Sequence, residues 1–169
     1  PESLIALSFE NLFNGCGVAV GDVNNDGMDD LFFTGNMTAG KLYLNKGAFQ
    51  FEDITAQSGI DTKGKWSSGA SMVDINEDGF LDIYICVGGY NKDEKVRANQ
   101  LYINQGDNTF VEQAEQYGLA DGGYSIHAAF LDYDKDNDLD MYLLTTELDP
   151  YSWTEFKPRR LKGEAANTD

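Results

Sequence analysis

Short apolar runs alternate along this chain with turns rich in Gly, Asn and Asp. Three runs of small and apolar residues each precede a polar segment, and three apolar or aromatic runs each follow one. The first set covers residues 17–21, 69–73 and 127–131, and the second covers residues 31–34, 83–86 and 141–144. Runs of this length, bounded by turn residues and rich in β-branched and aromatic side chains, predict strands and not helices.

The same pattern continues beyond these strand pairs. Residues 41–47 match residues 100–106, and residues 51–60 match residues 110–119 without a gap. Both matching stretches contain an Asn-x-Gly step, at Asn45 and at Asn104, where Gly supplies the positive φ of a hairpin turn. Each unit therefore contains four strands. The sequence predicts an all-β fold of β-propeller blades with four antiparallel strands each, and a single helical turn after each outer strand.

The number of blades is not a closed count. We expect an N-terminal strand at 1–14 that could close a ring, blade 1 at 15–60, blade 2 at 61–119, the start of blade 3 at 120–146, and an inter-strand insertion or truncated end at 147–169. Because propellers have four to eight blades, these two and a half to three blades indicate part of a larger propeller. It could have seven blades, and further blades or other subunits would close the ring.

One polar phrase of nine residues occurs three times, at residues 22–30, 74–82 and 132–140. Asp or Asn stands at its positions 1, 3, 5 and 9, and Gly or Asn stands at position 6, where a left-handed turn is expected. Oxygen donors at such spacing wrap around a hard cation. Calcium accepts six to eight oxygens in flexible geometry, whereas magnesium requires a strict octahedron. The pattern therefore favours calcium, up to three ions.

Two alternatives to this interpretation can be compared with it. An EF-hand would need Glu at position 12 and flanking helices, but position 12 is Phe33, Ile85 or Leu143, each inside a predicted strand. Asp, Asn and Gly also make tight turns without any metal, an explanation that three aligned copies make less attractive. The third copy has Asn137 in place of Gly and one extra acid, Asp134, so we expect it to bind at least as well.

The net charge of −17 excludes some functions. Three calcium ions would offset about six of these charges, and the remaining acidity argues against nucleic acid as a partner. No apolar run approaches the length of a membrane helix. Loops with three acids and no bidentate Glu bind weakly, so they fill where calcium is plentiful, which favours export. We expect Cys16 and Cys86 to be buried thiols, with a disulfide as the alternative.

The motif Val-Ala-Val-Gly-Asp-Val-Asn-Asn-Asp-Gly at residues 18–27, with the later Leu-Tyr-x-Asn-x-Gly, resembles the FG-GAP/VCBS repeat. This repeat builds the propellers of integrin α-subunits and occurs in many bacterial surface and secreted proteins. The resemblance covers about residues 15–146. It implies calcium ligands from side chains and, at position 7, from backbone carbonyls: Asp22, Asn24, Asp26, Met28 and Asp30; Asp74, Asn76, Asp78, Phe80 and Asp82; Asp132, Asp134, Asp136, Asp138 and Asp140.

No catalytic motif stands out in the sequence. The single histidine, His127, lies in a predicted inner strand, and the paired carboxylates already belong to the loops. We therefore expect a non-enzymatic, extracellular or cell-surface module that binds a protein or glycan or serves adhesion or scaffolding. The alternative is an accessory part of a larger secreted carbohydrate-active enzyme. Five aromatic residues could form a sugar or partner surface or simply pack between strands: Trp66, Tyr90, Tyr124, Tyr151 and Trp153.

Overall fold

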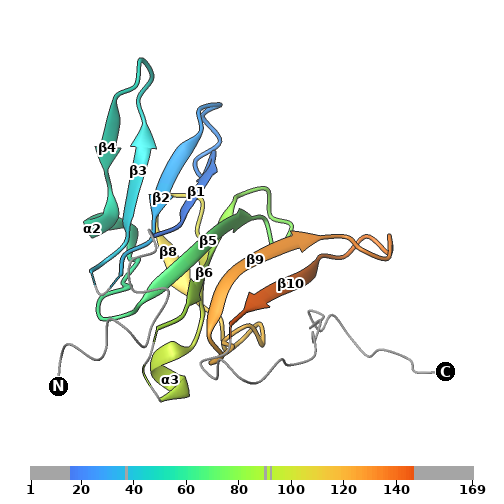
Figure 1. The fold of residues 1–169 in the computed structure, drawn as a ribbon. Helices are drawn as coiled ribbons and strands as arrows, with labels where there is room; N and C mark the ends of the chain where they lie inside the picture. Colours follow the sequence, from blue (N-terminus) through green and yellow to red (C-terminus); the bar gives the residue numbers. More distant parts are fainter. Residues whose placement is uncertain (1–15, 37, 90, 92, 147–169) are drawn as a thin grey trace.

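A computed structural model describes residues 16–36, 38–89, 91 and 93–146 (Figure 1). Within them, two four-stranded sheets are followed by a two-stranded sheet. The elements are β1 (Val18–Gly21), β2 (Asp30–Phe33), β3 (Lys41–Asn45), β4 (Phe51–Asp53), α2 (Thr55–Ser58), β5 (Ser67–Val73), β6 (Asp82–Val87), α3 (Glu94–Arg97), β7 (Gln100–Asn104), β8 (Phe110–Glu112), β9 (Ser125–Leu131) and β10 (Asp140–Thr145).

All pairings are antiparallel between strands that are consecutive in sequence, in the orders β1-β2-β3-β4 and β5-β6-β7-β8, with β9 beside β10. The predicted all-β fold with four-stranded antiparallel blades is confirmed. The strand and the insertion expected at 1–14 and 147–169 lie outside the described residues.

The third and fourth strands of each complete sheet are joined at the expected turns. Gly47 and Gly106 have φ values of +77° and +76°. The side chain of Asn45 accepts a hydrogen bond from Gly47 N at 2.9 Å, and Asn104 accepts one from Gly106 N at 3.0 Å. An Asx side chain that binds the backbone two residues later stabilises such a turn. The matched Asn-x-Gly steps therefore form matched hairpins.

The hydrophobic core lies between neighbouring sheets. Strand β5 lies between β1 and β9, so that the sheets are arranged as a fan (Figure 1). One cluster packs Phe32 and Leu42 of the first sheet against Ile83 and Ile85 of the second. A second cluster packs Tyr84 and its neighbours against the sheet of β9 and β10. All six residues of β6 are buried, and after Asp82 its sequence is a continuous apolar run, as is usual for a strand in a sheet that is covered on both faces.

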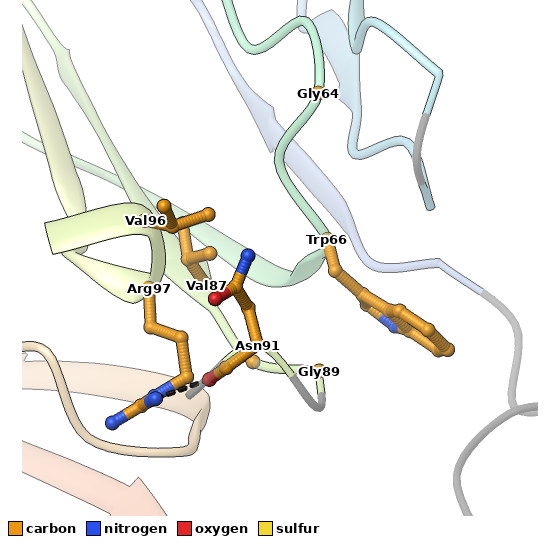
Figure 2. A pocket seen from close by; sticks show the side chains of 8 residues that line it. Gly64, Trp66, Val87, Gly89, Asn91, Val96 and Arg97 are labelled. Atoms are coloured by element: carbon orange, nitrogen blue, oxygen red, sulfur yellow. Dashed lines mark hydrogen bonds between the residues drawn. The ribbon is translucent and has the colours of Figure 1, made fainter. Parts of the chain in front are cut away.

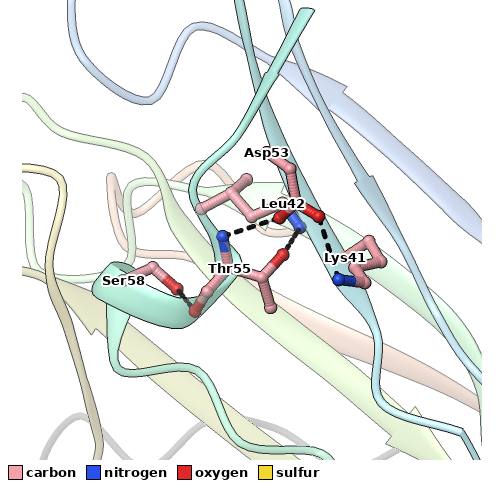
Figure 3. A network of polar contacts seen from close by, with 5 residues as sticks. All are labelled: Lys41, Leu42, Asp53, Thr55 and Ser58. Atoms are coloured by element: carbon pink, nitrogen blue, oxygen red, sulfur yellow. Dashed lines mark hydrogen bonds and ion pairs between the residues drawn. The ribbon is translucent and has the colours of Figure 1, made fainter.

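A polar network fixes the outer edge of the first sheet (Figure 3). Asp53 forms an ion pair with Lys41 at 2.9 Å and accepts a hydrogen bond from Thr55 N at 3.0 Å. Leu42 N in turn donates to the Thr55 hydroxyl at 2.9 Å. The hydrogen bond with Thr55, together with Lys41, lowers the pKa of Asp53 to about 2. Asp53 therefore stays ionised and links β4, β3 and the start of α2.

The predicted helical turns have different outcomes. Helix α2 forms at the first site, and at the second a hydrogen bond from Tyr117 N to Gln113 O of 3.1 Å closes a single turn without a helix. Helix α3 was not predicted. Its N-cap is Asp93, whose carboxylate accepts a hydrogen bond from Lys95 N at 3.0 Å, and Asp at this position is a common helix start.

Both cysteines are free, but only one of them is buried. Cys86 lies inside β6 and is fully buried, as expected, whereas the expectation of a buried Cys16 is wrong, because Cys16 is exposed next to β1. Burial, and to a smaller extent the charge of Asp121, raises the pKa of the Cys86 thiol to about 12. The two thiols therefore differ strongly in reactivity, because the thiolate is the reactive form.

We expect Cys16 to react with a thiol reagent such as DTNB at pH 8 within minutes, and Cys86 to react only when the chain unfolds. The measurement is a count of released thionitrobenzoate in buffer and in denaturant, with Cys16→Ser as the control that removes the fast phase. Rapid reaction of both thiols in buffer would contradict the burial of Cys86.

Two adjacent aromatic residues in β2 provide a test of the core between sheets. Phe32 is fully buried, whereas Phe33 is 42% exposed and makes an edge contact with Tyr43. We expect Phe32→Ala to lower the free energy of unfolding by about 3–5 kcal/mol and Phe33→Ala by about 1 kcal/mol. Urea denaturation of the 169-residue chain measures both values. Phe32→Leu keeps most of the volume and should cost less than about 1.5 kcal/mol; equal costs for the two alanine variants would overturn the assignment.

Candidate metal-binding loops

The three polar phrases form the loops that connect the first two strands of each sheet. Loop 1 (residues 22–30) joins β1 to β2, loop 2 (residues 74–82) joins β5 to β6, and loop 3 (residues 132–140) joins β9 to β10. The last residue of each phrase is the first residue of a strand. The repeated sequence therefore has a repeated location in the fold.

Within loop 1, the side-chain oxygens of positions 1 and 3 turn inward onto the backbone. Asp26 N donates to Asp22 Oδ1 and to Asn24 Oδ1, both at 3.1 Å, and Gly27 N donates to Asp22 Oδ2 at 2.7 Å. The amide of Asn24 donates to Asp26 Oδ2 at 3.1 Å. Three of the predicted ligand side chains thus converge on one small region of the loop.

Loop 2 has the same geometry. Asp78 N donates to Asp74 Oδ1 at 3.0 Å and to Asn76 Oδ1 at 3.2 Å, Gly79 N donates to Asp74 Oδ2 at 2.9 Å, and the Asn76 amide donates to Asp78 at 2.9 Å. Loops that share sequence and internal hydrogen bonds would present their oxygens to a cation in the same way.

Loop 3 has a carboxylate at positions 1, 3 and 5, and the three lie close together. Asp132, Asp134 and Asp136 can each place one oxygen within 4.8 Å of the others, and all three are exposed. Asn137 N donates to Asp132 Oδ2 at 3.2 Å. The backbone N–H of Asp138 lowers the pKa of Asp136, and the hydrogen bond with Asp136 raises the pKa of the Asp138 carboxyl. Like charges at this spacing repel one another unless a cation or a proton intervenes.

The turn at position 6 has the predicted left-handed conformation, with φ of +85° at Gly27, +90° at Gly79 and +70° at Asn137. Position 4 is left-handed as well, at Asn25, Glu77 and Lys135, with φ between +57° and +62°. The sequence pattern did not indicate the second feature, because only Asn25 is a residue that favours this region. Each loop thus contains two residues in the left-handed conformation within three consecutive positions.

The aspartate at position 9 has a structural role that the sequence did not reveal. Asp30 accepts hydrogen bonds from Val23 N at 3.0 Å and from Asn45 N at 2.8 Å. Asp82 accepts them from Ile75 N at 3.0 Å and from Asn104 N at 2.8 Å. Each carboxylate therefore ties the start of its loop to the end of the third strand.

Both of these aspartates are fully buried. Burial raises the pKa of Asp30, and it raises the pKa of Asp82 to about 6. The two backbone N–H groups at each carboxylate oppose this shift, because they favour the ionised form. Each carboxylate oxygen has a second lone pair, so these hydrogen bonds leave acceptor capacity toward the loop.

Position 7 contributes its N–H group to the loop. Met28 N donates to Asp26 Oδ1 at 3.0 Å, Phe80 N donates to Asp78 Oδ1 at 2.9 Å, and Asp138 N donates to Asp136 Oδ1 at 3.2 Å. The role of the position 7 carbonyls as ligands stays a prediction. The donor atoms of all three loops are oxygens, which is the ligand chemistry of calcium and magnesium, and the chemistry of the residues present thus suits a hard cation.

Two of the candidate aromatic residues, Trp66 and Tyr124, are among the described residues, and both lie near Arg97. Trp66 is half-buried and lines a small pocket with Gly89, Asn91 and Arg97 (Figure 2). The Arg97 guanidinium donates to Gly122 O at 3.0 Å and to Asn91 O, and it lies 4.2 Å from the centre of the Tyr124 ring. Arg97 thus connects the backbone at Asn91 to the backbone at Gly122.

The remaining aromatic candidates, Tyr90, Tyr151 and Trp153, lie outside the described residues. His127 lies in β9 and is exposed. In the part of the chain that the structure describes, no helix is both long and apolar enough to span a membrane.

The FG-GAP-like repeat family matches this chain twice, over residues 22–85 and 85–143. The chain belongs to the FG-GAP-like repeat family. The first match runs from the start of loop 1 into β6, and the second runs from β6 into β10. Together they cover most of the described sheets. The family resemblance expected from the motif is thereby confirmed.

Among known proteins, the chain is similar to integrin alpha-8 of Mus musculus, with 38% identity over 95 residues that cover 48% of this chain and 9% of the relative. It is also similar to cartilage acidic protein 1 of Xenopus tropicalis, with 26% identity over 140 residues that cover 80% of this chain and 20% of the relative. Cartilage acidic protein 1 of Homo sapiens is 32% identical over 69 residues. The chain spans a fifth or less of the length of these relatives.

The left-handed glycine of loop 2 provides a test of the loop geometry. A Cβ on Gly79 would meet nothing within 4 Å, so a substitution there is strained only by its φ of +90°. We expect Gly79→Ala to lower the free energy of unfolding by about 1–2 kcal/mol, and Gly79→Asn to recover part of this loss, because Asn tolerates positive φ. Urea denaturation in the presence of a chelator measures both. An Ala variant as stable as the parent would show that the loop does not adopt this turn.

Proposed function

We propose that this chain is part of an extracellular, non-catalytic β-propeller in which calcium bound at the three loops stabilises the blades and a protein or glycan is the ligand. The observation that carries the proposal is the repeated convergence of oxygen donors in loops of one geometry. Similarity to integrin alpha-8 and cartilage acidic protein 1 supports an extracellular setting.

Each calcium ion would be bound by the residues of a single loop. In loop 1 these would be Asp22, Asn24, Asp26 and Asp30 with the carbonyl of Met28, and the corresponding residues would serve in loops 2 and 3. A bound cation offsets the repulsion between the carboxylates and favours the folded loop, in which they are close together. The buried Asp30 and Asp82 would link the cation to the core.

The exposed faces of the first and third sheets support a larger propeller. Val18 and Val20 are 50% and 55% exposed, yet their counterparts in the second sheet, Ala70 and Met72, pack against the first sheet. In the third sheet, Tyr142 and Leu144 are exposed, while their counterparts Tyr84 and Cys86 are fully buried. Both faces are thus of the kind that a neighbouring sheet covers between blades, and we propose that further blades cover them.

The calcium sites predict a metal-dependent stability. We expect the metal-stripped chain to gain about 2.7 kcal/mol per site when free calcium reaches a hundredfold excess over Kd. For a chain of this size, this corresponds to a rise in Tm of about 5–10 °C per occupied site. Thermal melts with calcium at sub-millimolar to millimolar levels measure the effect, and parallel melts with magnesium should show little change.

Two variants separate loop binding from general ionic effects. Asp74→Asn with Asp78→Asn removes two charged oxygens from loop 2 and should reduce the calcium-dependent rise, whereas Asp53→Asn removes a carboxylate outside the loops and should leave the rise intact. An equal melting temperature in chelator and in calcium would contradict the proposal.

A further inference from the structure

Two side chains connect loop 1 to loop 2. The amide of Asn25, at position 4 of loop 1, donates a hydrogen bond to the carbonyl of Gly79 in loop 2 at 2.9 Å. The amide of Asn104, in the second sheet, donates to Val23 O of loop 1 at 2.8 Å and to Leu81 O of loop 2 at 3.0 Å. Neither Asn25 nor Asn104 is among the predicted metal ligands.

The first connection joins groups that hold the predicted ligands in place. Asn25 stands between Asn24 and Asp26, the ligands at positions 3 and 5 of loop 1. The Gly79 residue that accepts its hydrogen bond also donates its own N–H to Asp74, the ligand at position 1 of loop 2. An ordered loop 1 therefore holds Gly79, and Gly79 in turn holds Asp74.

The second connection is buried and joins the two aspartates at position 9. Val23 N donates to Asp30 Oδ2, and Val23 O accepts from Asn104. The N–H of Asn104 donates to Asp82 Oδ1 at 2.8 Å. A path of consecutive hydrogen bonds thus runs from Asp30 through Val23 and Asn104 to Asp82.

Loop 2 lacks the side-chain N–H donor that would make the corresponding hydrogen bond to loop 3. The residue at position 4 of loop 2 is Glu77, whose carboxyl side chain has no N–H group to donate to a carbonyl as the Asn25 amide does. Glu77 has the same left-handed backbone as Asn25, with φ of +58° against +57°. The two positions therefore differ in their side chain and not in their geometry.

We propose that cation binding at loop 1 and at loop 2 is positively coupled, and that the Asn25 side chain carries part of this coupling. The inference rests on the proposed calcium sites. Charge alone predicts the opposite sign, since the three carboxylates at the ligand positions of an empty loop 1 favour a cation at the neighbouring loop 2, and a filled loop 1 favours it less. Salt at an ionic strength of about 0.15 M weakens this charge effect, whereas the hydrogen bonds remain.

The test uses the full 169-residue chain labelled with ¹⁵N and titrated with calcium in 0.15 M KCl. The amide signals of Gly27, Gly79 and Asn137 report the occupancy of loops 1, 2 and 3 separately. Asp22→Asn with Asp26→Asn prevents calcium binding at loop 1 over the concentrations titrated, and it removes two negative charges, which is the same change in net charge that a bound calcium ion makes there. We expect this change to weaken calcium binding at loop 2 about three- to fivefold and to leave loop 3 unchanged.

Asn25→Gly removes the donor but keeps the left-handed backbone. In this background, we expect that disabling loop 1 weakens loop 2 by less than half of the original factor. Glu77→Gly is the matched control, because it makes the same backbone change in loop 2 where no such hydrogen bond exists, and it should leave the coupling between loops 1 and 2 unchanged. Asp74→Asn with Asp78→Asn disables loop 2 and should in turn weaken calcium binding at loop 1, because coupling between two binding sites is reciprocal.

Each outcome separates this inference from the proposed function. Amide signals that do not move with calcium would overturn the calcium sites themselves. Signals that titrate, with a loop 2 affinity that stays equal or rises when loop 1 is disabled, would leave the sites and overturn the coupling. Coupling that persists in full in Asn25→Gly would overturn the role of Asn25.

Discussion

A buried carboxylate at the first residue of the second strand is the interaction on which each complete sheet depends. Asp30 and Asp82 have no exposed surface, and an isolated charge in such a position costs several kcal/mol. Two backbone N–H groups offset this cost at each site. Because one N–H comes from the loop and the other from the end of the third strand, the same carboxylate fixes the loop and the hairpin register together.

This arrangement links the nine-residue phrase to the strands that follow it in each complete sheet. The third strand ends at an Asn, which is Asn45 or Asn104. Its backbone N–H donates to the buried aspartate, and its side-chain oxygen accepts a hydrogen bond from the N–H of the turn glycine. A single Asp and a single Asn thus connect loop, strand and turn. A change at either residue would disturb all three segments at once, because they depend on the same hydrogen bonds.

The strands, the loops and the turns could be predicted from the sequence because each follows from local chemistry. Apolar runs of strand length, Asn-x-Gly steps and spaced Asp residues act within a few neighbouring residues. The features that could not be predicted depend on contacts between distant residues. The burial of Asp82, the exposure of Cys16 and the hydrogen bond from Asn25 to Gly79 follow from how the sheets pack, which no short pattern encodes.

The left-handed conformation at position 4 shows a further limit. Glu77 and Lys135 adopt it at positive φ, although neither residue favours that region, so the loop closure outweighs a local cost of about 1 kcal/mol. Propensity would have suggested an ordinary turn at both. In the third repeat, Asp140 is half-buried and accepts a hydrogen bond from Tyr133 N at 2.9 Å, and among the described residues its sheet contains only β9 and β10.

The repeats are alike at the positions that would bind a cation and unlike at the positions between them. Position 4 is Asn, Glu and Lys in the three loops, which are respectively a donor and acceptor, an acceptor and a donor. Only Asn25 meets a carbonyl of the next loop among the described residues. In a repeat protein, stability is a sum of terms within repeats and between neighbours. A residue between the predicted ligand positions can thus supply an interaction between neighbouring repeats, as Asn25 does, and the different residues at position 4 make this interaction differ from one pair of loops to the next.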